Sequence, residues 1–179
     1  MDDNKKKIAF IINPISGTQG KEHILKWLDE KLDKNRYMPE VIYTEWAGHA
    51  VEIAARKAKE EVFAVVAIGG DGTINEIARS LVHTKTALGI IPCGSGNGLA
   101  RHLQIPMEAK KAIDIINEGL IDIIDYGKIN DVPFFCTCGV GFDAFVSLQF
   151  SKAGRRGPLI YLETVSYTHL RAHETTLHL

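Results

Sequence analysis

The residues best suited to chemistry in this chain stand together in one turn, Gly69-Gly70-Asp71-Gly72. Glycines suit a turn in which the backbone bends tightly and a ligand comes close, because a Cβ atom would obstruct both. If a helix begins at this turn, its unpaired amide groups and the positive end of its dipole favour an anion such as a phosphate chain. Asp71 would be repelled by phosphates unless a metal ion, a proton or a hydroxyl donor lies between them. The turn therefore predicts phosphate chemistry, and the alternative is a plain Asx turn.

The segments on either side of this turn predict a strand and a helix. Residues 62–68 form a short apolar run, mostly β-branched, which is typical of a buried parallel strand. Over residues 73–82, apolar side chains recur at the spacing of one helical face. The turn is therefore expected at the carboxyl end of a strand, where a helix begins.

Two further loops that contain glycine and polar residues follow predicted strands. A strand over residues 8–12 leads into Asn13-Pro14-Ile15-Ser16-Gly17 and a helix over 21–32, and a strand over 87–91 leads into Pro92-Cys93-Gly94-Ser95-Gly96-Asn97-Gly98. The first loop lacks the spacing of a P-loop, and the second has a leucine where the Rossmann fingerprint has its third glycine. Open α/β sheets bind ligands at the carboxyl ends of their strands, so the three loops together predict one shared site.

The pattern alternates strands and helices up to residue 119 and then changes. A strand is expected over residues 40–44, and helices over 49–60 and 106–118, the last one ended by Gly119. Residues 120–129 and 133–140 then alternate apolar and polar side chains, and Asn130-Asp131 between them predicts a hairpin turn. We therefore expect an α/β domain over residues 1–119 and the beginning of a β-rich domain over 120–164. Residues 165–179 show no strand or helix period and are interpreted as a non-native tail.

Composition and charge exclude several classes of protein. The net charge is −1 with both signs mixed, so no basic field indicates binding to nucleic acid. Three cysteines are too few for a disulfide framework, and their spacing is not that of a zinc site. No apolar stretch approaches the roughly 20 residues that cross a bilayer. We expect a cytoplasmic protein whose contact with membranes is peripheral.

The two tryptophans of the chain, Trp27 and Trp46, are interpreted as aromatic residues of the core or its rim. His49 follows Gly48 at the start of a predicted helix and is expected to be a surface or capping histidine rather than a metal ligand. None of the three is counted among the candidate site residues.

Four motifs, in their order along the chain, resemble the diacylglycerol kinase catalytic-domain family. They are Asn13-Pro14-Ile15-Ser16-Gly17, Gly69-Gly70-Asp71-Gly72-Thr73-Ile74-Asn75-Glu76, Pro92-Cys93-Gly94-Ser95-Gly96-Asn97 and Gly141-Phe142-Asp143-Ala144. This family contains bacterial lipid kinases and eukaryotic sphingosine, ceramide and diacylglycerol kinases. The second motif alone is also similar to loops of NAD kinases and phosphofructokinases, whereas the four together, within residues 5–163, are specific to the family.

The resemblance implies both a fold and an activity. The fold would be a Rossmann-like α/β nucleotide-binding domain of the NAD kinase and phosphofructokinase type, followed by a β-sandwich lipid-binding domain, with a cleft between the two. The activity would be transfer of the γ-phosphate of ATP, with Mg²⁺, to the hydroxyl of a lipid such as diacylglycerol or a sphingoid base at the membrane surface. Family members are longer, so we expect this chain to lack part of the second domain and some catalytic and metal-binding residues. A homodimer is left open.

The resemblance also implies which residues bind ATP. Asp71 would organise Mg²⁺ and the γ-phosphate or act as the base toward the lipid hydroxyl, and no set of metal ligands is assigned. The alternatives are an NAD kinase-like phosphotransferase and a nucleotide-binding module or fragment without turnover. The residues expected to contact ATP are Asn13, Pro14, Ile15, Ser16, Gly17, Thr44, Gly69, Gly70, Asp71, Gly72, Thr73, Ile74, Asn75 and Ser95.

Overall fold

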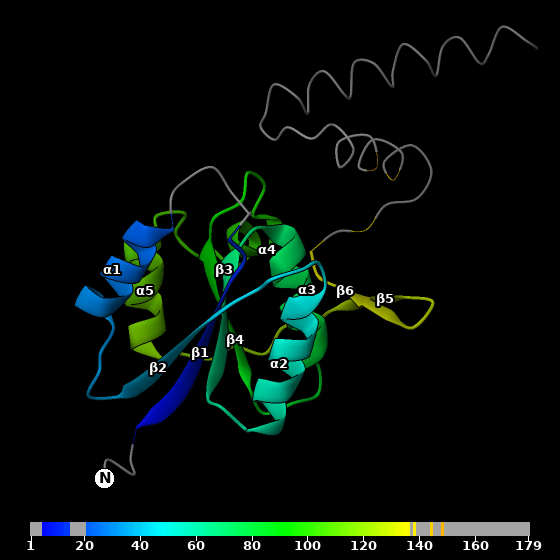
Figure 1. Ribbon diagram of the computed structural model, residues 1–179. Helices are drawn as coiled ribbons and strands as arrows, with labels where there is room; N and C mark the ends of the chain where they lie inside the picture. The colour runs from blue at the N-terminus through cyan, green and yellow to red at the C-terminus, as the bar shows by residue number, and fades with distance from the viewer. Residues whose placement is uncertain (1–4, 15–20, 137, 139–143, 145–147, 149–179) are drawn as a thin grey trace, which may run out of the picture. The chain divides into compact units, whose positions relative to one another are not determined.

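The computed structural model describes residues 5–14, 21–136, 138, 144 and 148. Its elements in chain order are β1 (Lys6–Ile12), α1 (Glu22–Lys31), β2 (Tyr37–Tyr43), α2 (His49–Lys59), β3 (Ala64–Gly69), α3 (Asp71–Leu81), β4 (Ala87–Pro92), α4 (Gly98–His102), α5 (Ala109–Glu118), β5 (Gly127–Ile129) and β6 (Val132–Phe134). In the compact unit Met1–Cys136, four parallel strands form a sheet in the order β2-β1-β3-β4 (Figure 1). The predicted α/β class with a Rossmann-like parallel sheet is confirmed.

The central strands β1 and β3 are buried along almost their whole length. Residues 8–12 of β1 pair in register with residues 64–68 of β3. Phe10, Ile11 and Val65 have no exposed surface. Helices cover both faces of these strands, so the strands need apolar side chains at every position rather than at alternate positions. For this reason the sequence predicts both strands as continuous apolar runs.

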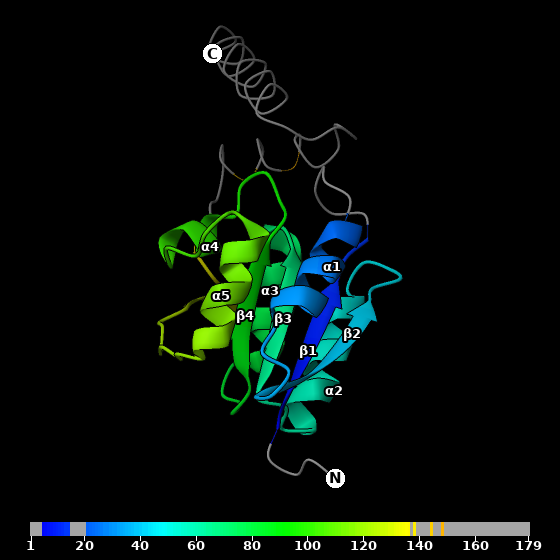
Figure 2. The same cartoon turned by 90° about the vertical axis from the view of Figure 1, so that its left-hand side faces the viewer.

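Two pairs of helices cover the two faces of the sheet (Figure 2). On one face lie α1 and α5, whose Leu28 and Ile113 share a buried cluster with Phe10. On the other face lie α2 and α3, and Ile53 of α2 shares a second cluster with Ile11. Successive side chains of a strand point to opposite faces, so Phe10 and Ile11 serve different clusters. The sheet is therefore wound on both sides.

The edge strand β2 begins at Tyr37, earlier than the strand predicted over residues 40–44. The Tyr37 side chain is buried, and its ring stacks on Phe63 with the centroids 5.9 Å apart. This contact joins segments that are distant in sequence, so the local pattern does not reveal it. Most of β2 is otherwise exposed, and Pro39 is tolerated because an edge strand can lack an N–H donor.

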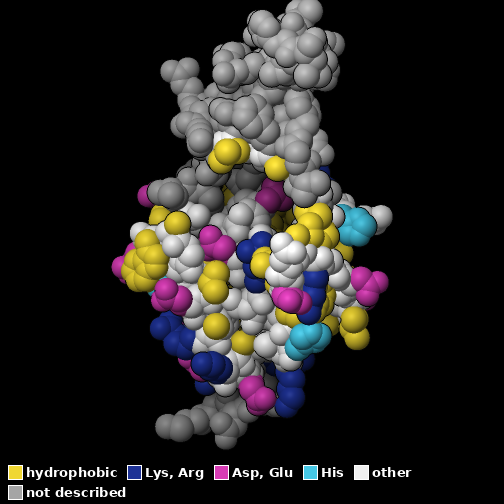
Figure 3. All heavy atoms as spheres, turned by 90° about the vertical axis from the view of Figure 1, so that its right-hand side faces the viewer, with side chains coloured by type: hydrophobic (Ala, Val, Ile, Leu, Met, Phe, Trp, Pro, Cys, Tyr) yellow, Lys and Arg dark blue, Asp and Glu magenta, His cyan; other side chains and the backbone are white. Residues whose placement is uncertain are grey.

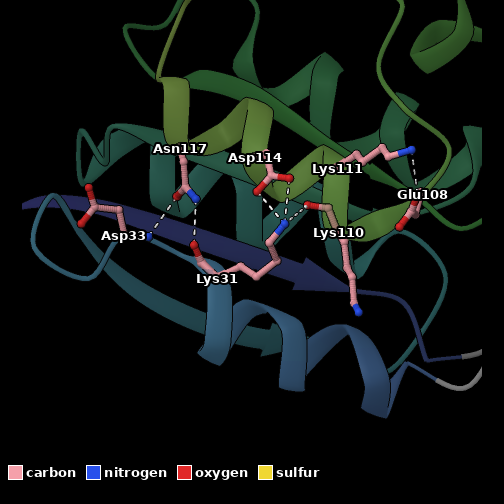
Figure 4. A network of polar contacts seen from close by, with 7 residues as sticks. All are labelled: Lys31, Asp33, Glu108, Lys110, Lys111, Asp114 and Asn117. Carbon is pink, nitrogen blue, oxygen red and sulfur yellow. Dashed lines mark hydrogen bonds and ion pairs between the residues drawn. The ribbon is translucent and has the colours of Figure 1, made fainter.

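A polar network joins α1 to α5 on the first face (Figure 4). The Lys31 ammonium lies 2.7 Å from the Asp114 carboxylate. The side chain of Asn117 donates to the Lys31 carbonyl at 2.8 Å and accepts from the Asp33 amide at 2.9 Å. Asn117 thereby satisfies a carbonyl at the end of α1, where helical carbonyls have no partner of their own. The two helices are held together by these contacts in addition to their apolar packing.

The predicted hairpin is confirmed, but only over part of the predicted length. Antiparallel strands β5 and β6 meet at Asn130 and Asp131, whose φ angles of 46° and 63° suit a two-residue turn. The expected strand over residues 120–129 is wrong before residue 127, because residues 120–126 have no strand assignment. A strand needs a partner strand, and Ile123 is fully exposed here. The domain boundary at residue 119 stays a prediction, and the proposed tail over 165–179 lies outside the described residues.

The surface that carries α2, α3 and the hairpin shows acidic, basic and apolar side chains interspersed (Figure 3). This agrees with the mixed charges and small net charge of the sequence. Within the described part of the chain, no helix has the length and apolarity needed to span a bilayer.

Lys57 of α2 is a buried cation held by two carboxylates. Its ammonium lies 2.8 Å from Glu40 of β2 and 2.8 Å from Glu60, while only 7% of its side chain is exposed. Burial alone would lower the pKa of Lys57, but its hydrogen bonds to the two carboxylates outweigh burial and raise that pKa. The hydrogen bond from Lys57 lowers the pKa of Glu60 below its ordinary value of 4.5. Lys57 joins α2 to the sheet edge through Glu40, whereas its ion pair with Glu60 lies at the end of the same helix and exists only while Glu60 is ionised.

We expect a Glu60→Gln variant to lower the free energy of unfolding at neutral pH. The pKa of Glu60 is lower in the folded state than its ordinary value of 4.5. Its ion pair therefore contributes fully to the free energy of unfolding above pH 4.5, and this contribution is lost as the pH falls through the lowered pKa of the folded state. The difference between the parent and the variant in urea unfolding should therefore shrink toward zero in acid. Glu30→Gln is the control, because Glu30 pairs with Lys26 at 3.8 Å and both are exposed. A difference that stayed constant down to strongly acid pH would contradict the prediction.

Candidate functional site

The carboxyl ends of the four parallel strands bring several predicted site residues into one row. The Thr44 amide donates to the Ile12 carbonyl at 2.8 Å, and the Asn13 amide approaches the Ile68 carbonyl at 3.4 Å. The Cys93 amide donates to the Gly69 carbonyl at 2.8 Å. Thr44, Asn13, Gly69 and Cys93 therefore follow one another along this edge, in the order of the strands that they end.

The start of α3 lies against this row. The side-chain amide of Asn13 donates to the Thr73 hydroxyl at 3.3 Å, which joins the end of β1 to the first turn of α3. A Cβ at Gly69 would lie 2.7 Å from the Cβ of Thr73. Gly69 is therefore required because the helix turns back over the strand end. The sequence predicted that the three residues belong to one site, and the structure brings them together.

Two glycine loops from neighbouring strands touch through their backbones. A Cβ at Gly94 would lie 2.7 Å from the Cα of Gly70, and a Cβ at Gly70 would lie 3.2 Å from the Cα of Gly94. Cβ atoms are essentially never found at the first of these distances. The sequence assigned such glycines to a tight turn and a close ligand. The structure adds another reason, which is contact between the loops.

The Asp71 carboxylate connects these loops through two charge-assisted hydrogen bonds. One oxygen accepts from the Asn97 amide at 2.8 Å, and the other accepts from the Gly98 amide at 2.6 Å. We call this arrangement the Asp71 bridge. Asp71 is the first residue of α3 and Gly98 the first of α4, so the bridge joins the starts of two helices. Such hydrogen bonds are stronger than those between neutral groups.

Asn97 closes the second loop on itself and was not among the predicted site residues. Its side chain accepts from the Gly94 amide at 2.9 Å and donates to the Gly94 carbonyl at 2.7 Å. The residue is buried and has a φ of 54°, a conformation that asparagine tolerates better than most residues. An asparagine between two glycines in a loop is the sequence signal that could have identified this role.

Lys21 brings a positive charge to the same edge. Burial lowers the pKa of Lys21, an effect that the neighbouring Cys93 opposes. Burial raises the pKa of the Cys93 thiol, and Lys21 in turn opposes that shift. Lys21 immediately precedes α1, and its electrostatic interaction with Cys93 places it near the end of β4. The sequence provides no P-loop pattern around this lysine, so motif reasoning did not select it.

The other predicted contacts fall into different environments. Ile74 belongs to the core, so only its backbone is available to a ligand. Ser95 and Pro14 are exposed. The side-chain oxygen of Asn75 is buried and accepts no hydrogen bond from a described residue. The predicted contacts Ile15, Ser16 and Gly17 lie outside the described residues, as does most of the motif over residues 141–144.

The described residues fit the phosphates of a nucleotide. The first turn of α3 leaves amides without helical partners, and the space where a Cβ of Gly72 would lie is open to at least 4 Å. Lys21 adds a cation near the same strand ends. Among the described residues, no three His, Cys, Asp or Glu side chains form a metal-binding group. The Asp71 carboxylate, which lies beside this turn, could contribute to binding a divalent cation together with phosphate oxygens and water.

Comparison with known proteins gives consistent matches over this part of the chain. The sequence profile of the family described as "Diacylglycerol kinase catalytic domain" matches residues 7–129. A diacylglycerol kinase from Staphylococcus saprophyticus is 35% identical over 132 residues, which are 73% of this chain and 43% of that protein. A diacylglycerol kinase from Bacillus subtilis is 36% identical over 140 residues, which are 76% and 46% of the two chains.

Comparison with solved structures also identifies diacylglycerol kinases as similar proteins. The crystal structure of a diacylglycerol kinase from Bacillus anthracis superposes with a TM-score of 0.64 at 25% identity, over 72% of this chain and 48% of that one. The chain thus spans less than half the length of each of these similar proteins.

We expect Gly94→Ala to lower the free energy of unfolding by about 1–3 kcal/mol, the usual cost of forcing an extra methyl group into a packed site. The new Cβ would meet the backbone of Gly70, which cannot rotate away. Gly72→Ala is the matched control, because its Cβ meets nothing within 4 Å and alanine favours a helix. Urea unfolding of both variants tests this. Equal stability of the two variants would contradict the close contact between the loops.

We expect Asp71→Asn to destabilise the fold by roughly 1 kcal/mol, a value reduced from that of buried charged hydrogen bonds because Asp71 is exposed. An asparagine would present an N–H₂ group to one of the two amide donors that the carboxylate now accepts. The control is Asp122→Asn, at an exposed position after α5. The measurement is the urea midpoint of each variant. If the two midpoints moved equally, the Asp71 bridge would not contribute to stability.

Proposed function

The chain belongs to the diacylglycerol kinase catalytic-domain family, and we propose that it is the nucleotide-binding part of an ATP-dependent lipid kinase. This enzyme would transfer the γ-phosphate of ATP to the hydroxyl of a lipid such as diacylglycerol or a sphingoid base. The observation that carries the proposal is the start of α3 at the carboxyl edge of the sheet, with Gly72 facing open space. The similarity of the chain to diacylglycerol kinases supports the choice of a kinase that acts on a lipid.

ATP would bind with its phosphates against the first turn of α3. The amides of this turn and the helix dipole favour negative charge there. Lys21 would add a positive charge from the neighbouring loop. Asn13 and Thr73, which are joined at 3.3 Å, would fix the strand end beside the phosphates. Phosphoryl transfer needs positioned reactants and stabilised charge more than covalent chemistry from the protein, and these groups supply both.

Asp71 would act beside the phosphates while it keeps the two loops together. Each of its oxygens accepts one amide hydrogen bond and retains a second lone pair. Those lone pairs could hold Mg²⁺, directly or through water, or accept the proton of the lipid hydroxyl. Magnesium bound to the phosphates would neutralise their charge, and phosphate oxygens and water would complete its ligands. In either role, the two hydrogen bonds of the Asp71 bridge would hold the carboxylate in position.

The lipid substrate places the reaction at a membrane surface. We propose a cytoplasmic enzyme that associates peripherally with the bilayer, and whose lipid-binding region includes residues after 119 and the part that the longer relatives contain. Transfer of phosphate to a soluble acceptor such as NAD would indicate the alternative function, that of an NAD kinase-like phosphotransferase. A chain that binds ATP without transfer to either acceptor would be a nucleotide-binding module.

We expect Gly72→Ala to weaken ATP binding about tenfold, which corresponds to about 1.4 kcal/mol, because the methyl group would enter the space beside the first-turn amides. Calorimetric titration of the 179-residue chain with ATP and magnesium measures this. The stability of the variant, measured by urea unfolding, separates crowding of the ligand from damage to the fold. Unchanged affinity would remove the start of α3 from the nucleotide site.

Transfer from radiolabelled ATP to diacylglycerol, sphingosine or ceramide in detergent micelles tests the reaction itself, with NAD in a parallel sample. Labelled lipid is the expected product, and it would identify the substrate. Labelled NADP would favour the alternative. ATP binding without any product would mean that residues outside this chain complete the catalytic site, whereas failure to bind ATP would overturn the proposal.

A further inference from the structure

The connection between β2 and α2 displays a stacked aromatic pair at the surface. The indole of Trp46 and the imidazole of His49 lie with their ring centroids 3.8 Å apart and their planes within 6° of each other. Trp46 is nevertheless 54% exposed. The indole of Trp46 therefore stacks on His49 with one face and still leaves a large aromatic surface open to solvent. We call these two residues the Trp46–His49 pair.

Local hydrogen bonds fix the geometry of this pair. The Glu45 amide donates to Nδ1 of His49 at 3.1 Å, and the His49 amide donates to the Trp46 carbonyl at 3.3 Å. Gly48 between them has a φ of 87°, which glycine adopts at little cost. Because Nδ1 accepts a hydrogen bond, the neutral imidazole carries its proton on Nε2. The orientation of the rings is thus set before any ligand arrives, which reduces the entropy lost on binding.

The Trp46–His49 pair follows the row of strand ends that forms the candidate site. Thr44, two residues before Trp46, is buried and is bonded to Ile12 at the end of β1. The next strand in the order is β3, whose end leads into α3. Neighbouring strands lie about 4.8 Å apart, so the ends of β2 and β3 are separated by roughly 10 Å. A nucleoside triphosphate can cover this distance between its base and its terminal phosphates.

We propose that the Trp46–His49 pair stacks the base of the nucleotide whose phosphates bind at the start of α3. This inference rests on the proposed function and adds to it the subsite that holds the base. Aromatic rings stack on the π-face of any base, and such stacking tolerates changes of base because it does not read hydrogen-bonding edges. The subsite would therefore favour a purine over a bare polyphosphate, and ATP and GTP would bind with similar affinity.

The two tryptophans of the chain allow a direct test. Trp27 lies on α1, on the opposite face of the sheet from α2, and stacks on His23 with centroids 6.1 Å apart. In a Trp27→Phe background, Trp46 is the remaining tryptophan and its fluorescence reports on the pair. The probes are ATP, GTP and inorganic tripolyphosphate, each with magnesium. Calorimetry on the same samples measures binding independently of fluorescence.

We expect ATP and GTP to quench Trp46 fluorescence with midpoints equal to the calorimetric dissociation constants, and tripolyphosphate to bind without quenching. Trp46→Ala should weaken ATP binding about tenfold and change tripolyphosphate binding less than twofold. Trp46→Phe should restore most of the ATP affinity, because a phenyl ring still stacks. The recovery by phenylalanine distinguishes loss of stacking from damage to the turn.

Several results would overturn the inference. ATP binding without quenching, or an equal loss of ATP and tripolyphosphate affinity in Trp46→Ala, would reject the base subsite and leave the proposed function standing. A change in Trp46 fluorescence with anionic lipid vesicles but not with nucleotides would assign the pair to membrane contact instead. If neither ATP nor tripolyphosphate bound, the base subsite and the proposed function would both be wrong.

Discussion

The constraint on which this site depends is direct contact between two loops that leave neighbouring parallel strands. Gly70 and Gly94 approach each other so closely that neither position has room for an undisturbed Cβ. Beside this contact, the Asp71 carboxylate accepts the amides of Asn97 and Gly98. The bridge fixes where α4 begins relative to α3. The ends of these two strands are neighbours because β3 and β4 pair in parallel, in a register that sets Gly69 opposite Pro92.

Much of the fold follows from local features of the sequence. Continuous apolar runs identify β1, β3 and β4, and the pair Asn130-Asp131 identifies the hairpin turn, because burial on both faces and positive φ angles each demand particular residues. The parts that were not predicted depend on distant partners. Tyr37 extends β2 by packing on Phe63. Residues 120–126 alternate in a manner typical of a strand, but alternation does not provide the neighbouring strand that hydrogen bonding requires.

The candidate site shows the same division. The sequence placed Asn13, Gly69 and Thr73 in one site because loops at the carboxyl edge of a parallel sheet converge, and the structure joins them. The sequence did not reveal the partners of Asp71, since a carboxylate in a glycine turn gives no indication of which amides lie opposite. Lys21 was missed because its position beside Cys93 depends on how separate loops pack, and no P-loop pattern surrounds it. Asn97 was missed although it belongs to the motif over residues 92–97, because its side chain holds its own loop through Gly94.

The partners of Asp71 are backbone amides, and this has a consequence for the evolution of the site. Every residue except proline carries an N–H, so most side chains could stand at positions 97 and 98 without removing the donors themselves. Pairwise covariation between sequences would therefore carry little trace of the contact. Deep mutational scanning would register the contact as intolerance at Asp71 and at Gly96, where a Cβ would lie 2.7 Å from a carboxylate oxygen of Asp71. Contacts of this kind can be seen in coordinates but leave little covariation signal in sequence alignments.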